Sequence, residues 1–215
     1  MLVVLLGLGT WQVERLHWKQ GILAQFAQAE RGPPAPLGPN PTPWTKVAVT
    51  GELRNDLSAL YGAEVRDTST GPTLGNDLIV PLIRPGQPPV LIDRGWVPGA
   101  RGHQLDQPTG PVTVTGYVHP ADAPSLFSAT DDMVGRQFFT LDPAAIGRAL
   151  GLGHVAPFTI VALSSTPNAP GIWPAPAQHL PQPSNNHLSY AITWYGLAAA
   201  LVVVFSLWVR KTVRS

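Results

Sequence analysis

The sequence contains no cysteine, and it carries few charged residues for its length. The absence of cysteine excludes disulfides, cysteine-ligated metal or iron–sulfur sites and a cysteine nucleophile. Charged residues make up 13% of the 215 residues, about half the share usual for a soluble globular protein. The formal net charge is +1, so the chain has no excess of basic residues that would bind nucleic acid, and it has no acidic tail. These features argue against an ordinary water-soluble protein and against a nucleic-acid-binding protein.

Proline is missing from both ends of the chain. All 24 prolines lie between Pro33 and Pro183, and all 13 acidic residues lie between Glu14 and Asp142. Proline breaks helices, so this partition predicts two helical ends around a non-helical middle. The predicted domains are a first membrane helix with an amphipathic extension, a β-rich domain with proline-rich linkers, and a second membrane helix with a basic tail, over residues 1–31, 32–183 and 184–215.

Residues 188–209 form an uncharged run of 22 residues near the C-terminus. A helix of that length spans roughly 33 Å, and the hydrocarbon core of a bilayer is ~30 Å thick. Tyr190 and Trp194 lie near the start of the run and Trp208 near its end, as in the aromatic belts of membrane helices. The run predicts a transmembrane helix rather than a buried core helix.

The N-terminal apolar run is shorter. Residues 1–13 are uncharged, and as a helix they cover only about 20 Å. A signal peptide is one interpretation, but a basic start and a small-residue cleavage site are lacking. The preferred interpretation is an uncleaved membrane helix that lacks its first turn or two, because Leu16, Ile22, Leu23 and Phe26 continue the helical pattern. With Arg210, Lys211 and Arg214 at the far end of the chain, both termini are expected in the cytoplasm.

The middle of the chain shows the pattern of a β-rich domain. Short alternating or β-branched runs are bounded by Gly, Pro, Asn and Asp, which is typical of antiparallel strands. They predict a small antiparallel barrel or sandwich. The predicted strands cover residues 46–54, 58–65, 77–83, 90–97, 112–118 and 158–163.

Other segments of the middle have distinct signals. One short helix is predicted over residues 143–150, with Asp142 as N-cap, Pro143 at the first helical position and Gly151 as the stop. The proline-rich stretches 33–43 and 167–183 are predicted to be stiff connectors between this domain and the helices.

Motifs of known enzyme classes are absent from the middle. It contains no GxSxG, HExxH, GxxxxGK[ST] or GxGxxG, and its histidines lack the spacing of a closed metal site. A long-range pairing of His103 with His119 stays open, and the adjacent Asp131 and Asp132 are interpreted as a solvated loop pair. An enzymatic function, such as a membrane-tethered hydrolase, is therefore the weaker hypothesis.

His187 stands just before the C-terminal apolar run. If a helix begins near it, Asn185 or Asn186 can cap the helix, and His187, Tyr190 and Trp194 then share one face. A neutral imidazole at a membrane boundary, beside an aromatic surface, is suited to bind haem iron axially. The alternative is a histidine at headgroup level that only anchors the helix.

Three groups of motifs resemble the surfeit-locus cytochrome c oxidase assembly family. The N-terminal group matches the pattern LGxWQxxRxxWK with residues 8–12, Arg15 and residues 18–19. The middle group comprises Gly51, residues 81–82 and the run Asp93-Arg94-Gly95-Trp96-Val97-Pro98. The C-terminal group matches NHLxYAxTWY with residues 186–188, Tyr190 and residues 193–195.

The resemblance implies a two-span assembly factor in the bacterial inner membrane, with the large loop in the periplasm. It implies that His187 ligates the iron of haem a, and that the partners are the lipid bilayer, the catalytic subunit of a haem-copper oxidase and haem a synthase. A scaffold that binds oxidase subunits and never handles haem is the alternative function.

Roles for the other motif residues are structural or mixed. Trp11 and Gln12 are expected either to pack against the second helix, with Gln12 donating a hydrogen bond, or to anchor the interface. Arg15 is expected to meet haem propionates or lipid phosphates, or to snorkel. Asp93 and Arg94 are expected to form an ion pair or to fix a turn, with ligand binding as the alternative, and Trp96 is expected in the core.

Overall fold

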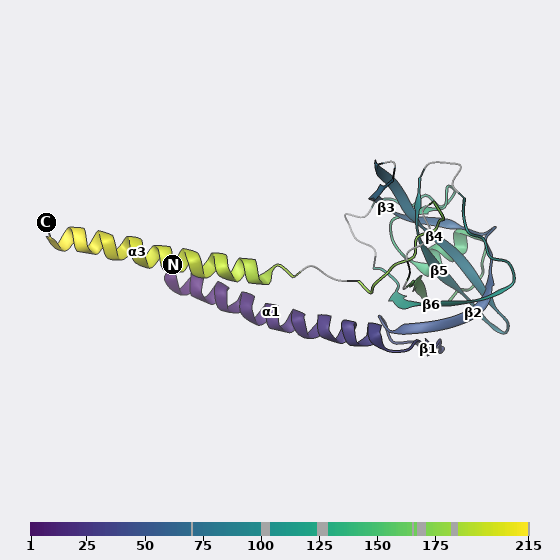
Figure 1. The fold of residues 1–215 in the computed structure, drawn as a ribbon, viewed down its shortest axis with the longest axis horizontal. Coiled ribbons are helices and arrows are strands. Elements are labelled where there is room, and N and C mark those ends of the chain that lie inside the picture. Colours follow the sequence, from purple (N-terminus) through teal and green to yellow (C-terminus); the bar gives the residue numbers. More distant parts are fainter. Residues whose placement is uncertain are drawn as a thin grey trace. The chain divides into compact units, whose positions relative to one another are not determined.

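The structure is a computed structural model that describes residues 1–69, 71–99, 104–123, 129–164, 166, 171–181 and 185–214. It contains two compact units, one formed by Met1–Gln28 with Pro181–Ser215 and the other by Ala29–Leu180. Figure 1 shows long helices in the first unit and a curled sheet in the second. The elements are α1 (Leu2–Arg31), β1 (Ala35–Pro36), β2 (Lys46–Leu53), β3 (Ala59–Thr68), β4 (Gly71–Arg84), β5 (Gln87–Pro98), β6 (Pro111–Pro120), β7 (Gln137–Phe138), α2 (Pro143–Ala149), β8 (Phe158–Ala162) and α3 (His187–Arg214).

Within the first unit, α1 and α3 pack side by side and run in opposite directions (Figure 1). The contacting residues are small or apolar and recur at helical spacing, with Leu5, Ala191 and Ala198 buried. Gly9 lies directly against the ring of Tyr195, and the hydroxyls of Thr10 and Tyr195 are 3.1 Å apart. Small residues let helix backbones approach closely where both helices are otherwise apolar.

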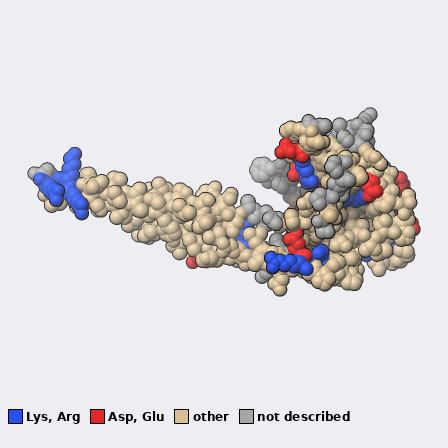
Figure 2. Space-filling view, in the orientation of Figure 1, with Lys and Arg blue, Asp and Glu red and all other residues tan. Residues whose placement is uncertain are grey.

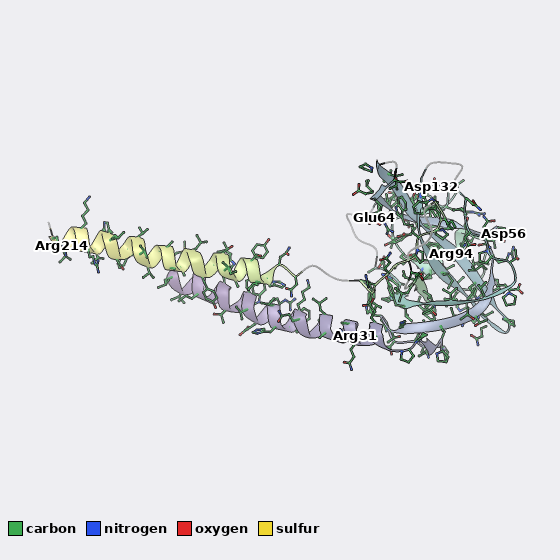
Figure 3. All side chains as sticks on the ribbon, in the orientation of Figure 1. Arg31, Asp56, Glu64, Arg94, Asp132 and Arg214 are labelled. Atoms are coloured by element: carbon green, nitrogen blue, oxygen red, sulfur yellow. The ribbon has the colours of Figure 1, made fainter. Side chains whose placement is uncertain are left out.

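By length and composition, α3 is apolar enough to cross a membrane. Among the described residues it is the one helix that meets this description. α1 carries Glu14, Arg15 and Lys19 within residues 2–19, so the membrane span predicted at the N-terminus stays a prediction. Figure 2 shows the long uncharged surface of α3 ending in a basic tip, which Arg214, labelled in Figure 3, marks at the end of the helix.

The sheet of the second unit closes on itself. Its strand order is β1-β2-β6-β8-β5-β4-β3-β7, and an additional pairing of β2 with β4 joins Glu52 to Ile83 and Leu53 to Leu82. The strands β2, β6, β8, β5 and β4 therefore form a small barrel. The six predicted strands are confirmed as β2, β3, β4, β5, β6 and β8, and the predicted helix as α2.

The barrel interior is an apolar core built from all five strands. Alternate residues of each strand point inward, as the pattern of β2 predicts, with Val47 and Val49 buried. A second apolar cluster lies on the opposite face of the sheet, where α2 packs through Ile146. The interior core comprises Val47, Val49, Leu82, Val90, Ile92, Val118, Ala156, Phe158 and Ile160.

The expectation of a wholly antiparallel sheet is wrong. β8 pairs antiparallel with β6 but parallel with β5, through Leu91–Thr159 and Ile92–Ile160. Such a parallel pair requires a long connection, which β6 and α2 provide. The short strands β1 and β7 also pair in parallel, with β2 and β3 respectively.

The proline-rich stretches are not simple connectors where the structure describes them. In the first, Ala35 and Pro36 form strand β1 against β2. In the second, Ala175 exchanges backbone hydrogen bonds of 3.0 and 2.8 Å with Trp96, and Ala177 bonds to Ala162. Backbone amides that pair with the barrel tie this segment down as a strap over its outer face. Residues 167–170 and 182–183 of the predicted connector lie outside the described part of the chain.

Candidate functional site

The candidate site joins the start of α3 to the first half of α1. His187 is the first residue of α3, and its Nδ1 lies 2.7 Å from Oε1 of Gln12. The two residues are 175 positions apart in the sequence. Gln12 is 9% exposed, and His187 is half-buried. The helix pair therefore places this polar contact, like that between Thr10 and Tyr195, within a largely apolar interface.

This contact fixes the state of the imidazole. A carbonyl oxygen only accepts hydrogen bonds, so the His187 Nδ1–H is the donor and Gln12 the acceptor. In this contact Gln12 accepts rather than donates, because the atom that faces the ring is its amide oxygen. With Nδ1 protonated, the neutral ring presents the lone pair of Nε2. A second group that binds one ring nitrogen and orients the other is the usual support for a histidine metal ligand.

The aromatic residues predicted to accompany His187 lie on the helix pair, and most of them are exposed. Tyr190 is 55% exposed and Trp11 is 51% exposed, whereas Trp194 is half-buried. They present flat apolar surface on both helices near the His187–Gln12 contact. The cap of α3 falls at Asn186, whose carbonyl accepts the Tyr190 N–H at 3.3 Å.

Arg15 lies on the exposed side of α1. Its guanidinium carbon stands 4.2 Å from the ring centroid of Trp18, a cation–π contact within one helical turn. No hydrogen bond joins Arg15 to His187 or Gln12 among the described residues. Its charge is therefore available to an anionic group that approaches the helix pair.

The strand run that begins at Asp93 serves a turn and the core. Asp93 Oδ1 accepts the Gly95 N–H at 2.9 Å, and Trp96 is 1% exposed. Arg94 does not pair with Asp93; it donates to the Asp106 carbonyl at 2.7 Å and contacts Asn55. Burial lowers the pKa of the Arg94 guanidinium, and Asp106 opposes that shift.

The remaining sequence candidates are accounted for within the described residues. Asp131 accepts the Phe139 N–H at 2.7 Å and Asp132 accepts the N–H groups of Val134 and Gly135, so both fix a turn. The pairing of His103 with His119 is not addressed, since His103 lies outside the described residues. In the part of the chain that the structure describes, no three His, Asp or Glu residues are placed to hold a metal ion.

The fold and site define a class: a small β-barrel domain inserted between two long helices whose contact orients a single histidine. Residues 1–199 match the sequence profile of the SURF1 family. The chain belongs to the SURF1 family.

Curated relatives are similar over nearly the whole chain. A SURF1-like protein of Rickettsia bellii is 29% identical over 214 residues, covering 97% of this chain and 88% of the relative. A SURF1-like protein of Monosiga brevicollis is 28% identical, covering 96% and 83%. Surfeit locus protein 1 of Rattus norvegicus is 28% identical, covering 97% and 72%.

Proposed function

We propose that this chain is an assembly factor for haem-copper oxidases that holds haem a through Nε2 of His187. The observation that carries the proposal is the 2.7 Å hydrogen bond from His187 Nδ1 to Gln12 Oε1, which leaves Nε2 as the basic nitrogen. Membership of the SURF1 family supports the same assignment. No catalytic step is assigned to the chain; its task is to hold and present a cofactor.

The residues around His187 fit such a group. Haem a would supply an iron, and Nε2 of His187 would hold it. Trp11, Tyr190 and Trp194 offer flat apolar surface to a macrocycle, and the exposed Arg15 offers a cation to its carboxylates. Gln12 acts as a positioning residue, because it keeps the His187 ring in one tautomer and one orientation.

The proposal includes a place in the bacterial inner membrane. α3 has the length and composition of a span, and its last turn carries Lys211 and Arg214. Cations at this end favour a cytoplasmic C-terminus. With α1 as a second span, the barrel stands in the periplasm, where the proposed partners are the oxidase catalytic subunit and haem a synthase.

The test is haem content. The full chain is purified in detergent from cells that make haem a, as wild type and as His187→Ala, Gln12→Leu and His17→Ala. We expect haem a at about one per chain in wild type and a loss of at least about tenfold in His187→Ala. Gln12→Leu is expected to retain haem with a shifted absorption spectrum and weaker binding, because the Nδ1 proton loses its acceptor.

His17 is the matched control, because it is an exposed histidine on the same helix pair. Its replacement should leave haem content unchanged. A wild-type protein that purifies colourless from these cells would instead support the scaffold that binds oxidase subunits without haem. Equal haem content in wild type and His187→Ala would reject His187 as the ligand.

A further inference from the structure

Polar side chains line a cavity in the barrel unit. None of these residues belongs to the candidate site on the helix pair. Val161 on β8 lies between Asp93 on β5 and Tyr117 on β6 and pairs with both. Tyr61 on β3 pairs with Asp77 on β4. Paired residues on neighbouring strands point to the same face of a sheet. Their neighbours Ile92 and Val118 belong to the barrel interior, so these polar residues lie on the outer face.

This outer face is hollowed into a cavity of about 200 Å³. Its walls combine these polar residues with apolar ones. The apolar residues come from the segment just before α2 and from the strap, residues 171–180. The strap is held in place at Gly95, which has φ +106° and no room for a Cβ against the backbone of Ala175. The polar residues that line the cavity are Tyr61, Arg66, Asp77, Asp93, Tyr117 and His119, and Leu141, Val161 and Ala177 are among the apolar ones.

Two carboxyl groups face this cavity. Asp93 is 5% exposed and accepts one hydrogen bond, from Gly95. Burial, reinforced by the charge of Asp77, raises the pKa of Asp93 to about 8, against the opposing effects of the Gly95 N–H and Arg66. Burial also raises the pKa of Asp77. At neutral pH the cavity therefore holds a protonated Asp93 beside the half-buried carboxyl group of Asp77.

Tyr117 is a buried residue that contributes a hydroxyl to the cavity lining. The residue is 6% exposed, and within the described residues its hydroxyl makes no hydrogen bond. Burial raises the pKa of Tyr117, and the charges of Asp93 and Asp77 raise it further, so the hydroxyl is within electrostatic reach of both carboxyl groups. A tyrosine this deeply placed normally uses its hydroxyl in a hydrogen bond, so this hydroxyl can bond to a polar group that enters the cavity.

The remaining polar groups add acceptors rather than free cations. The Arg66 guanidinium donates to Glu64 at 2.7 and 2.9 Å and lies 5.5 Å from the Trp96 ring centroid. His119 Nδ1 lies 2.7 Å from the Pro120 carbonyl, so it donates there and Nε2 keeps a lone pair. The Arg66 cation is thus engaged with Glu64, while the carboxyl groups of Asp77 and Asp93 and the two tyrosine oxygens offer acceptors to a group that enters the cavity.

We propose that this cavity binds a small ligand that carries a primary ammonium group on a short apolar chain. Carboxylates and a phenol oxygen suit the three N–H donors of an ammonium, and Leu141, Val161 and Ala177 suit the chain. A divalent metal suits the cavity less well, since Ca²⁺ takes six to eight oxygen ligands and no three His, Asp or Glu residues converge within the described residues. The proposal does not depend on haem binding at His187.

Binding couples to the loss of a proton. An ammonium beside Asp93 favours its carboxylate form, so the Asp93 proton leaves to solvent as the cation enters. The groups that face Asp93 are Asp77 on β4, Tyr61 and Arg66 on β3, and Tyr117 and His119 on β6, while the strap presents alanines. At pH 7 about one proton is released per ligand bound, and affinity rises toward pH 8.

Isothermal titration of the full chain in detergent tests this proposal with n-butylammonium chloride as the probe. We expect saturable binding at pH 7, with heats in phosphate and HEPES, neither of which carries a primary ammonium group, that differ by the ionisation of about one buffer proton. Neutral n-butanol, bulky tetramethylammonium and K⁺ should show no saturable binding. Asp93→Asn should weaken affinity at least about tenfold, and Tyr117→Phe about fivefold.

Asp56→Asn is the matched control, because Asp56 is an exposed carboxylate on the same unit, 61% exposed in its side chain. Near-ultraviolet circular dichroism verifies that each variant is folded. The proposal is overturned if n-butylammonium does not saturate, if n-butanol binds equally well, or if folded Asp93→Asn and Tyr117→Phe keep wild-type affinity. Haem content in the His187→Ala experiment is unaffected by any of these outcomes, so the two proposals fail separately.

Discussion

Single residues decide how closely the helices of the first unit approach. A Cβ at Gly9 would come within 2.8 Å of the Tyr195 ring, closer than real Cβ contacts allow, whereas a Cβ at Gly7 would meet nothing within 4 Å. The same close approach brings Gln12 to His187. Gly9 therefore sets the spacing that the candidate site requires.

Replacing Gly9 by valine should push the helices apart. We expect the distance between spin labels on cysteines introduced at the exposed Val3 and Val203 to increase by about 2 Å, since interaxial distances follow the side chains at the contact. Double electron–electron resonance measures this distance, and the absence of native cysteine makes the labelling specific. Gly7→Val should leave the distance unchanged; the same shift in both variants would contradict the role of Gly9.

At the scale of elements, sequence and structure agree where the signal is local. The strands follow from alternation between turn residues, and α2 follows from Asp142 before Pro143. The parallel β5–β8 pair, the strap over Trp96 and the Gln12–His187 contact join distant residues, and no local periodicity specifies them. The polar cavity was missed for the same reason, because register brings Tyr61, Asp93 and Tyr117 together from three strands.

The N-cap of α2 is a test of this local determination. The Asp142 carboxylate accepts the Ala144 N–H at 2.9 Å, so Asp142→Ala should lower the free energy of unfolding of the barrel unit by about 1 kcal/mol. Urea titration of the full chain in detergent, followed by near-ultraviolet circular dichroism, measures the loss. Asp56→Ala removes only an exposed pair with Arg54 and should change little. Equal effects of the two variants would show that the Asp142 cap does not stabilise α2.

At the scale of the whole molecule, charged residues are scarce. Among the described residues, Asp93 has a strongly raised pKa, and its titration is expected to dominate the dependence of stability on pH. Folded Asp93 keeps its proton up to about pH 8, whereas the unfolded chain loses it near pH ~4. The folded state thus binds more protons across this window. The stabilisation is complete below pH ~4 and disappears as pH rises through about 8.

The free energy of unfolding of the barrel unit should therefore fall as pH rises from 5 to 8, by up to ~1.4 kcal/mol per pH unit from Asp93. Asp93→Asn removes the titrating proton and should flatten this slope, while Asp56→Asn should retain it. Urea titrations of the full chain at pH 5, 6, 7 and 8 measure the slopes. A variant slope as steep as that of wild type would show that other groups carry the dependence.

The two ends of the barrel unit meet. Glu30 and His179 lie 3.0 Å apart, and Lys46 donates to the Glu30 carbonyl at 3.1 Å, so the chain enters and leaves this unit at one point. A unit with adjoining ends can be treated as a cassette, that is, as a segment exchanged as a whole. A short Gly–Ser linker can replace it, and its two ends can be joined to give a circular permutant. Recombination between relatives can accordingly exchange this cassette in one piece, leaving the helical hairpin and its histidine to evolve on their own.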